Sequence, residues 1–156
     1  MKQFFFLIFL FFIIRVTLNS QTCLPEGISF TSQTEIDDFQ TNYPNCSKIL
    51  GDVFINGSDI NSLTGLSVIT DLGSSMTIRG NDILQNLNGL DNLATINNSL
   101  TIGNYMYPNS SLINLSGLNN LTNIGECLLI WDNDKLVSIE ALNNLETVGN
   151  GVMIKD

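Results

Sequence analysis

The three cysteines are the side chains of this sequence most able to do chemistry, as nucleophiles, zinc ligands or disulfide partners. They stand at positions 23, 46 and 127, and the sequence contains no histidine. A cysteine nucleophile is usually activated by a neighbouring base, and a zinc ion is usually held by four ligands. Cys127 has no histidine to activate it, and three cysteines make a poor zinc set. The cysteines therefore favour neither catalysis nor metal binding.

A run of oxygen-bearing side chains at Asp132, Asn133 and Asp134 is the main candidate metal site. Calcium prefers clustered oxygen ligands, but no full ligand loop surrounds this run. Because turns favour Asp and Asn without any cation, we expect a turn here, with no metal and no cofactor. The sequence also lacks the Gly-x-Ser-x-Gly elbow and the phosphate-binding loop of common enzyme classes. We predict that the chain is not an enzyme.

The charge of the chain excludes one class of partner. The 156 residues include 15 acidic and 6 basic side chains, a formal net charge of −9 at pH 7. Without the first 20 residues, which contain Lys2 and Arg15, 15 acidic and 4 basic side chains leave −11. Nucleic-acid binding needs basic clusters that neutralise phosphates. We therefore expect no nucleic-acid partner.

Residues 1–20 have the pattern of a secretory signal peptide. An apolar run from Phe4 to Ile14 follows Lys2, and this run is shorter than the roughly 20 residues of a membrane span. Its length matches the apolar core of a signal peptide, and the small Ser20 suits cleavage. A lipoprotein signal at Cys23 and an uncleaved anchor are the alternatives. We predict a secreted or cell-surface protein.

Residues 21–48 are predicted to form an N-terminal cap with a helix. Export permits disulfides, and Cys23 and Cys46 bracket this unit, so we pair them and leave Cys127 as a free thiol. Ser32 and Glu35 fit a capping box, in which Ser32 caps the helix and Glu35 reaches back. The apolar stripe of this helix is Ile36, Phe39 and Tyr43. Pro44 then ends the helix.

From residue 49 the sequence repeats at about 24 residues. The units open at Ile49, Leu72, Ile96, Ile124 and Val148, in steps of 23, 24, 28 and 24 residues. Four residues later come Val53, Met76, Leu100, Leu128 and Val152, and two further on come Ile55, Ile78, Ile102, Ile130 and Ile154. A second block spaces its apolar residues by three, as in Leu87, Leu90 and Leu93. The third unit carries four extra residues, around 103–110.

These spacings predict a β-solenoid. Apolar residues two apart point inward from a short strand, and residues three apart suit tight 3₁₀-like turns with one buried edge. One coil cannot bury its apolar edge alone, so we expect stacked coils with one parallel sheet. Asparagines favour bends, and several repeat there: Asn81, Asn92, Asn120, Asn133 and Asn144.

The pattern Leu-x-x-Leu-x-Gly-Leu-x-x-Leu-x-x-Ile-Gly-x-x-Leu-x-Ile-x-x-Asn, clearest in residues 112–133, resembles the receptor L-domain repeat. The opening Cys23-Leu24-Pro25-Glu26-Gly27-Ile28-Ser29-Phe30, with Tyr43-Pro44-Asn45-Cys46, resembles the start of secreted bacterial proteins that carry this domain. The resemblance covers residues 23–156 and implies right-handed, leucine-rich-repeat-like coils. It also implies a surface role without specifying a ligand.

We expect residues 49–156 to be an incomplete receptor L-domain-like solenoid. The fifth unit opens at Val152 and contains only the predicted strand 152–156. Because a solenoid needs a cap over its last coil, we expect either a fragment of a longer protein or an end-to-end contact through this uncapped coil.

The outer side chains of the predicted sheet form the candidate binding face. One row contains Phe54, Thr77, Thr101, Leu129 and Met153, and a second contains Asn56, Arg79, Gly103, Trp131 and Lys155. An exposed apolar patch usually marks a contact site, although scattered exposed apolar residues are normal. The candidate ligand-binding residues are Phe54, Arg79, Tyr105, Tyr107, Leu129, Trp131 and Met153.

The sequence favours a non-catalytic recognition or adhesion module that presents this face to a protein or a glycan. A structural spacer within a longer surface protein is the alternative. A carbohydrate-active enzyme is disfavoured because the predicted face offers Arg79 and Lys155 but no carboxylate pair.

Overall fold

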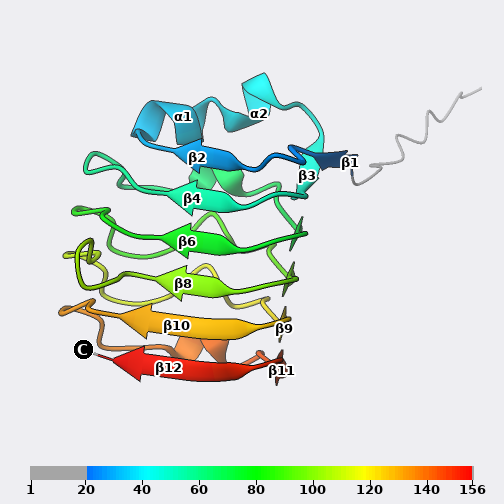
Figure 1. Ribbon diagram of the computed structural model, residues 1–156. Coiled ribbons are helices and arrows are strands. Elements are labelled where there is room, and N and C mark those ends of the chain that lie inside the picture. Colours follow the sequence, from blue (N-terminus) through cyan, green and yellow to red (C-terminus); the bar gives the residue numbers. More distant parts are fainter. Residues whose placement is uncertain (1–20, 156) are drawn as a thin grey trace, which may run out of the picture.

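The computed structural model describes residues 21–155, so the signal peptide predicted for residues 1–20 lies outside the described part. Two parallel sheets of six strands each dominate the fold, with few helices (Figure 1). Successive strands alternate between the two sheets, and we call each circuit of the chain through both sheets a coil. This arrangement is compatible with a solenoid.

The odd-strand sheet has the order β1-β3-β5-β7-β9-β11, and the even-strand sheet has the order β12-β10-β8-β6-β4-β2. The odd strands are β1 (Gln21–Cys23), β3 (Cys46–Ile49), β5 (Asp71–Leu72), β7 (Thr95–Ile96), β9 (Asn123–Ile124) and β11 (Thr147–Val148). The even strands are β2 (Ile28–Phe30), β4 (Val53–Ile55), β6 (Met76–Ile78), β8 (Leu100–Ile102), β10 (Cys127–Trp131) and β12 (Gly151–Lys155).

The prediction of a single parallel sheet was wrong, because the structure has two. The even-strand sheet is the predicted one. The odd-strand sheet contains the column that opens each unit, and four of its strands are only two residues long. Two residues give no alternation that distinguishes a strand from a turn, so periodicity alone could not reveal this sheet.

The apolar columns stack in register between the sheets, as predicted. Met76 pairs with Leu100 and Leu100 with Leu128, while Ile78 pairs with Ile102. These side chains are at most 2% exposed. The apolar residues spaced by three are equally buried in the first three repeats: Leu63, Leu66, Ile69, Leu87, Leu90, Leu93, Leu115, Leu118 and Leu121. The coils therefore share one continuous aliphatic core, as the stacking of repeats requires.

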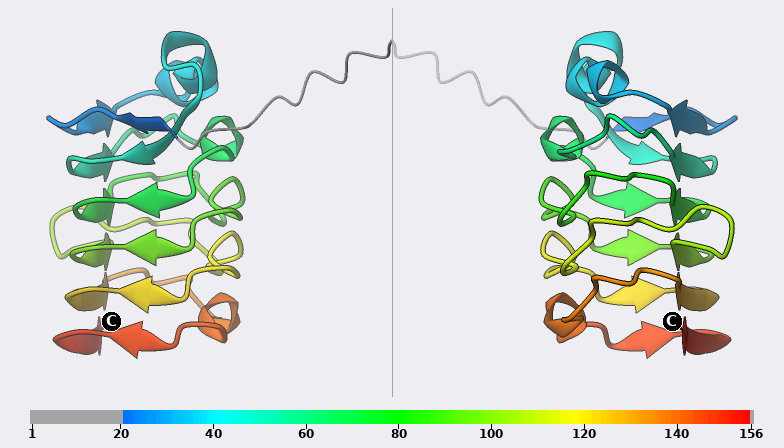
Figure 2. Two further views of the ribbon diagram at one scale, coloured as in Figure 1. Left: turned by 90° about the vertical axis from the view of Figure 1, so that its right-hand side faces the viewer. Right: turned by 90° about the vertical axis from the view of Figure 1, so that its left-hand side faces the viewer.

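The turns that complete the coils lie together on one side of the stack (Figure 2). Two of them contain 3₁₀ helices, η1 (Thr64–Leu66) and η2 (Glu140–Leu142). In the middle coils, Gly89 and Gly117 have φ of +113° and +112°, and a Cβ on either would collide with the carbonyl oxygen of Leu63 or Leu87. Glycine is needed at these two positions for both reasons.

Two short helices lie at the N-terminal end of the stack, α1 (Gln33–Asp37) and α2 (Phe39–Asn42) (Figure 1). The predicted single helix is therefore interrupted at Asp38. The Oγ of Ser32 accepts the N–H of Glu35 at 3.4 Å, and the Glu35 carboxylate accepts the N–H of Thr31 at 2.6 Å. Glu35 thus reaches back one residue further than a standard capping box. Ile36 and Phe39 are buried.

The Cys23–Cys46 disulfide is present and Cys127 is a free, partly buried thiol, as predicted. The disulfide joins the neighbouring strands β1 and β3. It therefore ties the edge strand β1 to the rest of the odd-strand sheet.

A buried asparagine ladder, Asn81, Asn109 and Asn133, runs along one corner of the stack. The Nδ2 of Asn81 donates to the Oδ1 of Asn109, and the Nδ2 of Asn109 donates to the Oδ1 of Asn133, both at 3.0 Å. Each Nδ2 also donates to a strand carbonyl of the preceding coil. The predicted asparagines at 92, 120 and 144 form a second, exposed ladder to backbone carbonyls.

The last coil leaves its inward-facing columns uncovered. Val152 and Ile154 are 56% and 50% exposed, whereas their counterparts in the preceding coils are at most 2% exposed. The edge strand β12 therefore presents apolar side chains to the solvent.

Candidate binding face

The outer face of the even-strand sheet carries the two predicted rows of side chains. Strand pairing places Phe54 beside Thr77, Thr77 beside Thr101, Thr101 beside Leu129 and Leu129 beside Met153 in a central row. Their neighbours along each strand point into the core, because side chains alternate across a strand.

Ser29 extends this central row, although the repeat pattern does not predict it. It pairs with Phe54, on strand β2. The signal was available, because Ile28-Ser29-Phe30 alternates in the same way as Val53-Phe54-Ile55. The repeat spacing does not include it, because β2 lies before the first repeat.

The second row stands at the carboxyl ends of the strands. Trp131 pairs with Lys155, while Asn56, Arg79 and Gly103 follow β4, β6 and β8. Gly103 is buried and not exposed. The Trp131 carbonyl and the Asn133 amide lie where a Cβ on Gly103 would stand.

The four-residue insert folds over this end of the sheet. The Oδ1 of Asn104 accepts the N–H groups of Met106 and Tyr107 at 3.0 and 2.8 Å, and the Tyr107 carbonyl accepts the N–H of Gly80 at 3.0 Å. Tyr105 and Met106 project at the tip, 86% and 72% exposed.

Arg79 and Tyr107 are in direct contact. The Cζ of Arg79 lies 5.2 Å from the Tyr107 ring centroid, which is the geometry of a cation–π interaction. The Nε of Arg79 is covered and has no acceptor among residues 21–155, and the same is true of the Trp131 indole N–H. Unpaired covered donors are uncommon in native structures and call for an explanation.

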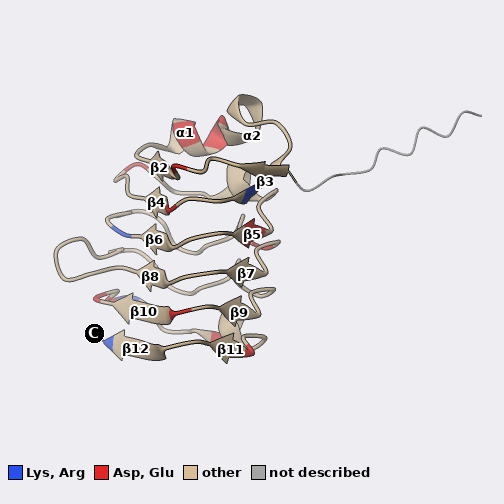
Figure 3. Ribbon diagram, turned by 45° about the vertical axis from the view of Figure 1, so that its right-hand side comes forward, with Lys and Arg blue, Asp and Glu red and all other residues tan. Residues whose placement is uncertain are grey.

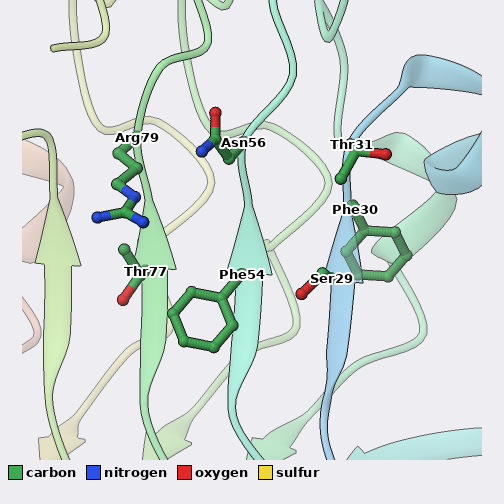
Figure 4. Close-up of a pocket in the computed structure, with 7 residues that line it drawn as sticks. All are labelled: Ser29, Phe30, Thr31, Phe54, Asn56, Thr77 and Arg79. Carbon is green, nitrogen blue, oxygen red and sulfur yellow. The ribbon is translucent and has the colours of Figure 1, made fainter. Parts of the chain in front are cut away.

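A shallow hollow of about 170 Å³ opens beside Arg79, and we call it the Arg79 hollow. It is lined by Ser29, Phe30, Thr31, Phe54, Asn56, Thr77 and Arg79. Figure 4 shows that these residues come from three neighbouring strands, β2, β4 and β6, and from the segments that follow them. The hollow therefore combines an aromatic ring, hydroxyl and amide groups, and one guanidinium.

The structure divides the seven predicted ligand-binding residues into two groups. Phe54, Arg79 and Tyr107 lie at or beside the Arg79 hollow. The other four lie further along the sheet, on β10 and β12, or at the tip of the insert: Leu129, Trp131, Met153 and Tyr105. The predicted residues thus share one face but do not line one pocket.

Charged groups are sparse on this face. The six even strands contain a single charged residue, Lys155, and Arg79 follows β6 (Figure 3). Most acidic side chains lie elsewhere, and several are hydrogen-bonded. The Asp52 pKa is lowered by the Ser74 hydroxyl and the Ser75 N–H. Burial raises the pKa of Asp71, but hydrogen bonds from Thr95 and Thr70 and the charge of Lys48 together bring it below its ordinary value.

The Asp132-Asn133-Asp134 run forms a turn whose central side chain is committed to the asparagine ladder. The Asn133 Oδ1 accepts from both the N–H and the Nδ2 of Asn109, so it is not directed at a cation. Within residues 21–155, no three His, Cys, Asp or Glu side chains are grouped to hold a metal. No helix in the same range has the length and apolarity needed to cross a membrane.

Comparison with family models, curated proteins and solved structures found no match. The function must therefore be inferred from the candidate binding face itself.

Proposed function

We propose that this chain is a non-catalytic recognition module that binds a protein or a glycan through the outer face of its even-strand sheet. The observation that carries the proposal is the exposed apolar and aromatic surface on this face. Phe54, Met153 and Tyr107 are 38%, 51% and 45% exposed, and Trp131 lies among them half-buried. Aromatic side chains on a rigid sheet are typical anchors of binding sites.

We further propose that the two sheets form the right-handed, leucine-rich-repeat-like solenoid of a receptor L-domain, with residues 49–156 as the solenoid and residues 21–48 as its N-terminal cap. Burial of Ile36 and Phe39 from the two short helices supports a capping role. In this proposal residues 1–20 direct export to the cell surface or medium. The Cys23–Cys46 disulfide is compatible with an oxidising compartment.

Removal of the aromatic anchors tests the recognition role. Wild-type protein, the double variant Trp131→Ala/Tyr107→Ala and the control Val137→Ala are applied to glycan arrays and to candidate protein surfaces. Val137 is an exposed apolar residue outside both rows. We expect the double variant to lose binding and the control to keep it. Unchanged binding by the double variant would reject this face.

A spacer role is the second candidate, and the exposed apolar side chains of the edge strand β12 favour it. A further coil packed on β12 would bury Val152 and Ile154, which are about half exposed. Such packing would place this chain within a longer stack or join it end to end with another chain. Sedimentation of wild type and of Ile154→Glu tests the contact between chains, because a buried carboxylate would prevent it.

A further inference from the structure

We propose that the Arg79 hollow binds a carboxylated sugar residue, a uronate unit of an acidic polysaccharide. This inference rests on the proposed recognition function and assigns a ligand class to one end of the same face.

Arg79 is held in place but is not neutralised. Its guanidinium stacks on Tyr107 at 5.2 Å, and no carboxylate pairs with it within residues 21–155. The Nε of Arg79 is covered, whereas its two Nη atoms are not. The Nη atoms are therefore the donors that face the solvent. Two parallel N–H groups match the two oxygens of a planar carboxylate.

The charge of the chain makes this arrangement selective. Residues 21–156 contain 15 acidic and only 4 basic side chains, and yet no acidic side chain among residues 21–155 pairs with Arg79. Such a chain repels polyanions in general. A ligand with one carboxylate aligned on Arg79 gains the local attraction, and screening by salt reduces the repulsion from the distant acids.

The walls of the hollow match the rest of a sugar ring. The Phe54 ring offers an apolar surface. Ser29 and Thr77 carry hydroxyl groups and Asn56 an amide, and none of the three has a side-chain hydrogen bond within the described residues. Hydroxyl and amide groups both donate and accept, as the hydroxyl groups of a sugar require. The Thr31 hydroxyl is already used, because it donates to Glu35 at 3.1 Å.

The size of the hollow favours one ring. Its volume of about 170 Å³ is below the roughly 300 Å³ at which pockets for whole drug-sized ligands begin. A peptide fits the observations less well. The strands β4 and β6 are paired on both sides, so an extended peptide lying across the outer face would find no free main-chain groups on them.

The test uses the folded, disulfide-bonded chain and three probes in calorimetric titrations. The probes are a galacturonate hexamer, the same hexamer with its carboxyl groups reduced to alcohols, and a peptide with a free C-terminal carboxylate. We expect binding of the acidic hexamer only. The reduced hexamer tests the carboxylate with an unaltered protein, so the result does not depend on whether any variant folds.

Variants then locate the site. We expect Arg79→Gln to weaken binding of the hexamer at least about tenfold, and Phe54→Ala to weaken it as well. Lys155→Gln is the matched control, because Lys155 is the other cation of the second row, and we expect a change within about twofold.

Equal affinity for the reduced hexamer, preference for the peptide, or unchanged binding by Arg79→Gln would each overturn the uronate assignment. The proposed function can survive that failure. If the chain ignores the hexamer but binds a neutral glycan or a protein in a manner that Trp131→Ala/Tyr107→Ala abolishes, the recognition role stands and only the ligand class is wrong.

Discussion

The guanidinium of Arg79 stacks on the ring of Tyr107, with 5.2 Å between the Cζ atom and the ring centroid. The contact links the end of β6 to the insert of the following coil, and it is reinforced by the backbone hydrogen bond from Gly80 to Tyr107. Among the described residues, Arg79 is the only cation beside the hollow. The insert therefore fixes the direction of its guanidinium.

Loss of this ring is expected to free Arg79 with little loss of stability. We predict that Tyr107→Ala lowers the free energy of unfolding by about 0.5–1 kcal/mol, measured by urea denaturation, and increases the mobility of the Arg79 Nε–Hε group in NMR relaxation. Tyr107→Phe keeps the ring and is the control. Equal mobility of Arg79 in wild type and Tyr107→Ala would show that the stacking does not position it.

The asparagine ladder is expected to be a major source of stability. Asn109→Ala removes the acceptor of Asn81 and the donor to the Ile78 carbonyl, all of them buried. Each buried polar group left unpaired costs about 1–3 kcal/mol, so we predict a loss of several kcal/mol in urea denaturation. The exposed Asn97→Ala is the control, expected to change stability by less than about 0.5 kcal/mol. Similar losses in both variants would contradict the ladder.

Reduction of the Cys23–Cys46 disulfide is predicted to destabilise the chain. The two cysteines are 23 residues apart in sequence, and closing a loop of that length in the unfolded chain corresponds to about 3 kcal/mol. The measurement is denaturation of Cys23→Ser/Cys46→Ser beside wild type. Cys127→Ser, which removes the free thiol, serves as the control and is expected to be nearly neutral.

Acid is predicted to destabilise the fold partly through Asp52. The Ser74 hydroxyl and the Ser75 N–H donate to its carboxylate at 2.5 and 3.0 Å and hold its pKa below the ordinary value of 3.8. Because the folded-state pKa is the lower one, the contribution is complete above the unfolded value and is lost as the pH falls through the folded value.

We therefore expect Asp52→Asn to lose less stability than wild type between about pH 5 and about pH 3, measured by thermal unfolding at each pH. Ser74→Ala removes one donor and is expected to reduce the acid sensitivity in the same direction. If both variants show the full wild-type loss, Asp52 does not contribute to it.

The repeat spacing sufficed to predict the register of the even-strand sheet. Met76, Leu100 and Leu128 recur with Ile78, Ile102 and Ile130 two residues later, and only stacked strands can bury both columns together. The same spacing placed Phe54 and Leu129 on the outer face, because side chains alternate across a strand.

The repeat spacing could not predict the contacts of the insert. An insertion breaks the repeat, so nothing in the spacing shows that Asn109 takes the ladder position held elsewhere by Asn81 and Asn133. Nor does it show that Tyr107 turns onto Arg79, since that depends on the path of the loop set by Asn104. The Arg79 hollow also needs Ser29, which precedes the repeats.

Trp131 offers the most direct measurement of whether ligands occupy this face. It is the only tryptophan in the sequence and lies half-buried in the second row, so tryptophan emission reports on this one position of the face. At saturation with a bound protein or glycan, we predict a shift in its emission and protection from acrylamide quenching. Binding that saturates in calorimetry and is lost in Trp131→Ala/Tyr107→Ala, but leaves the emission and the quenching of Trp131 unchanged, would contradict the account.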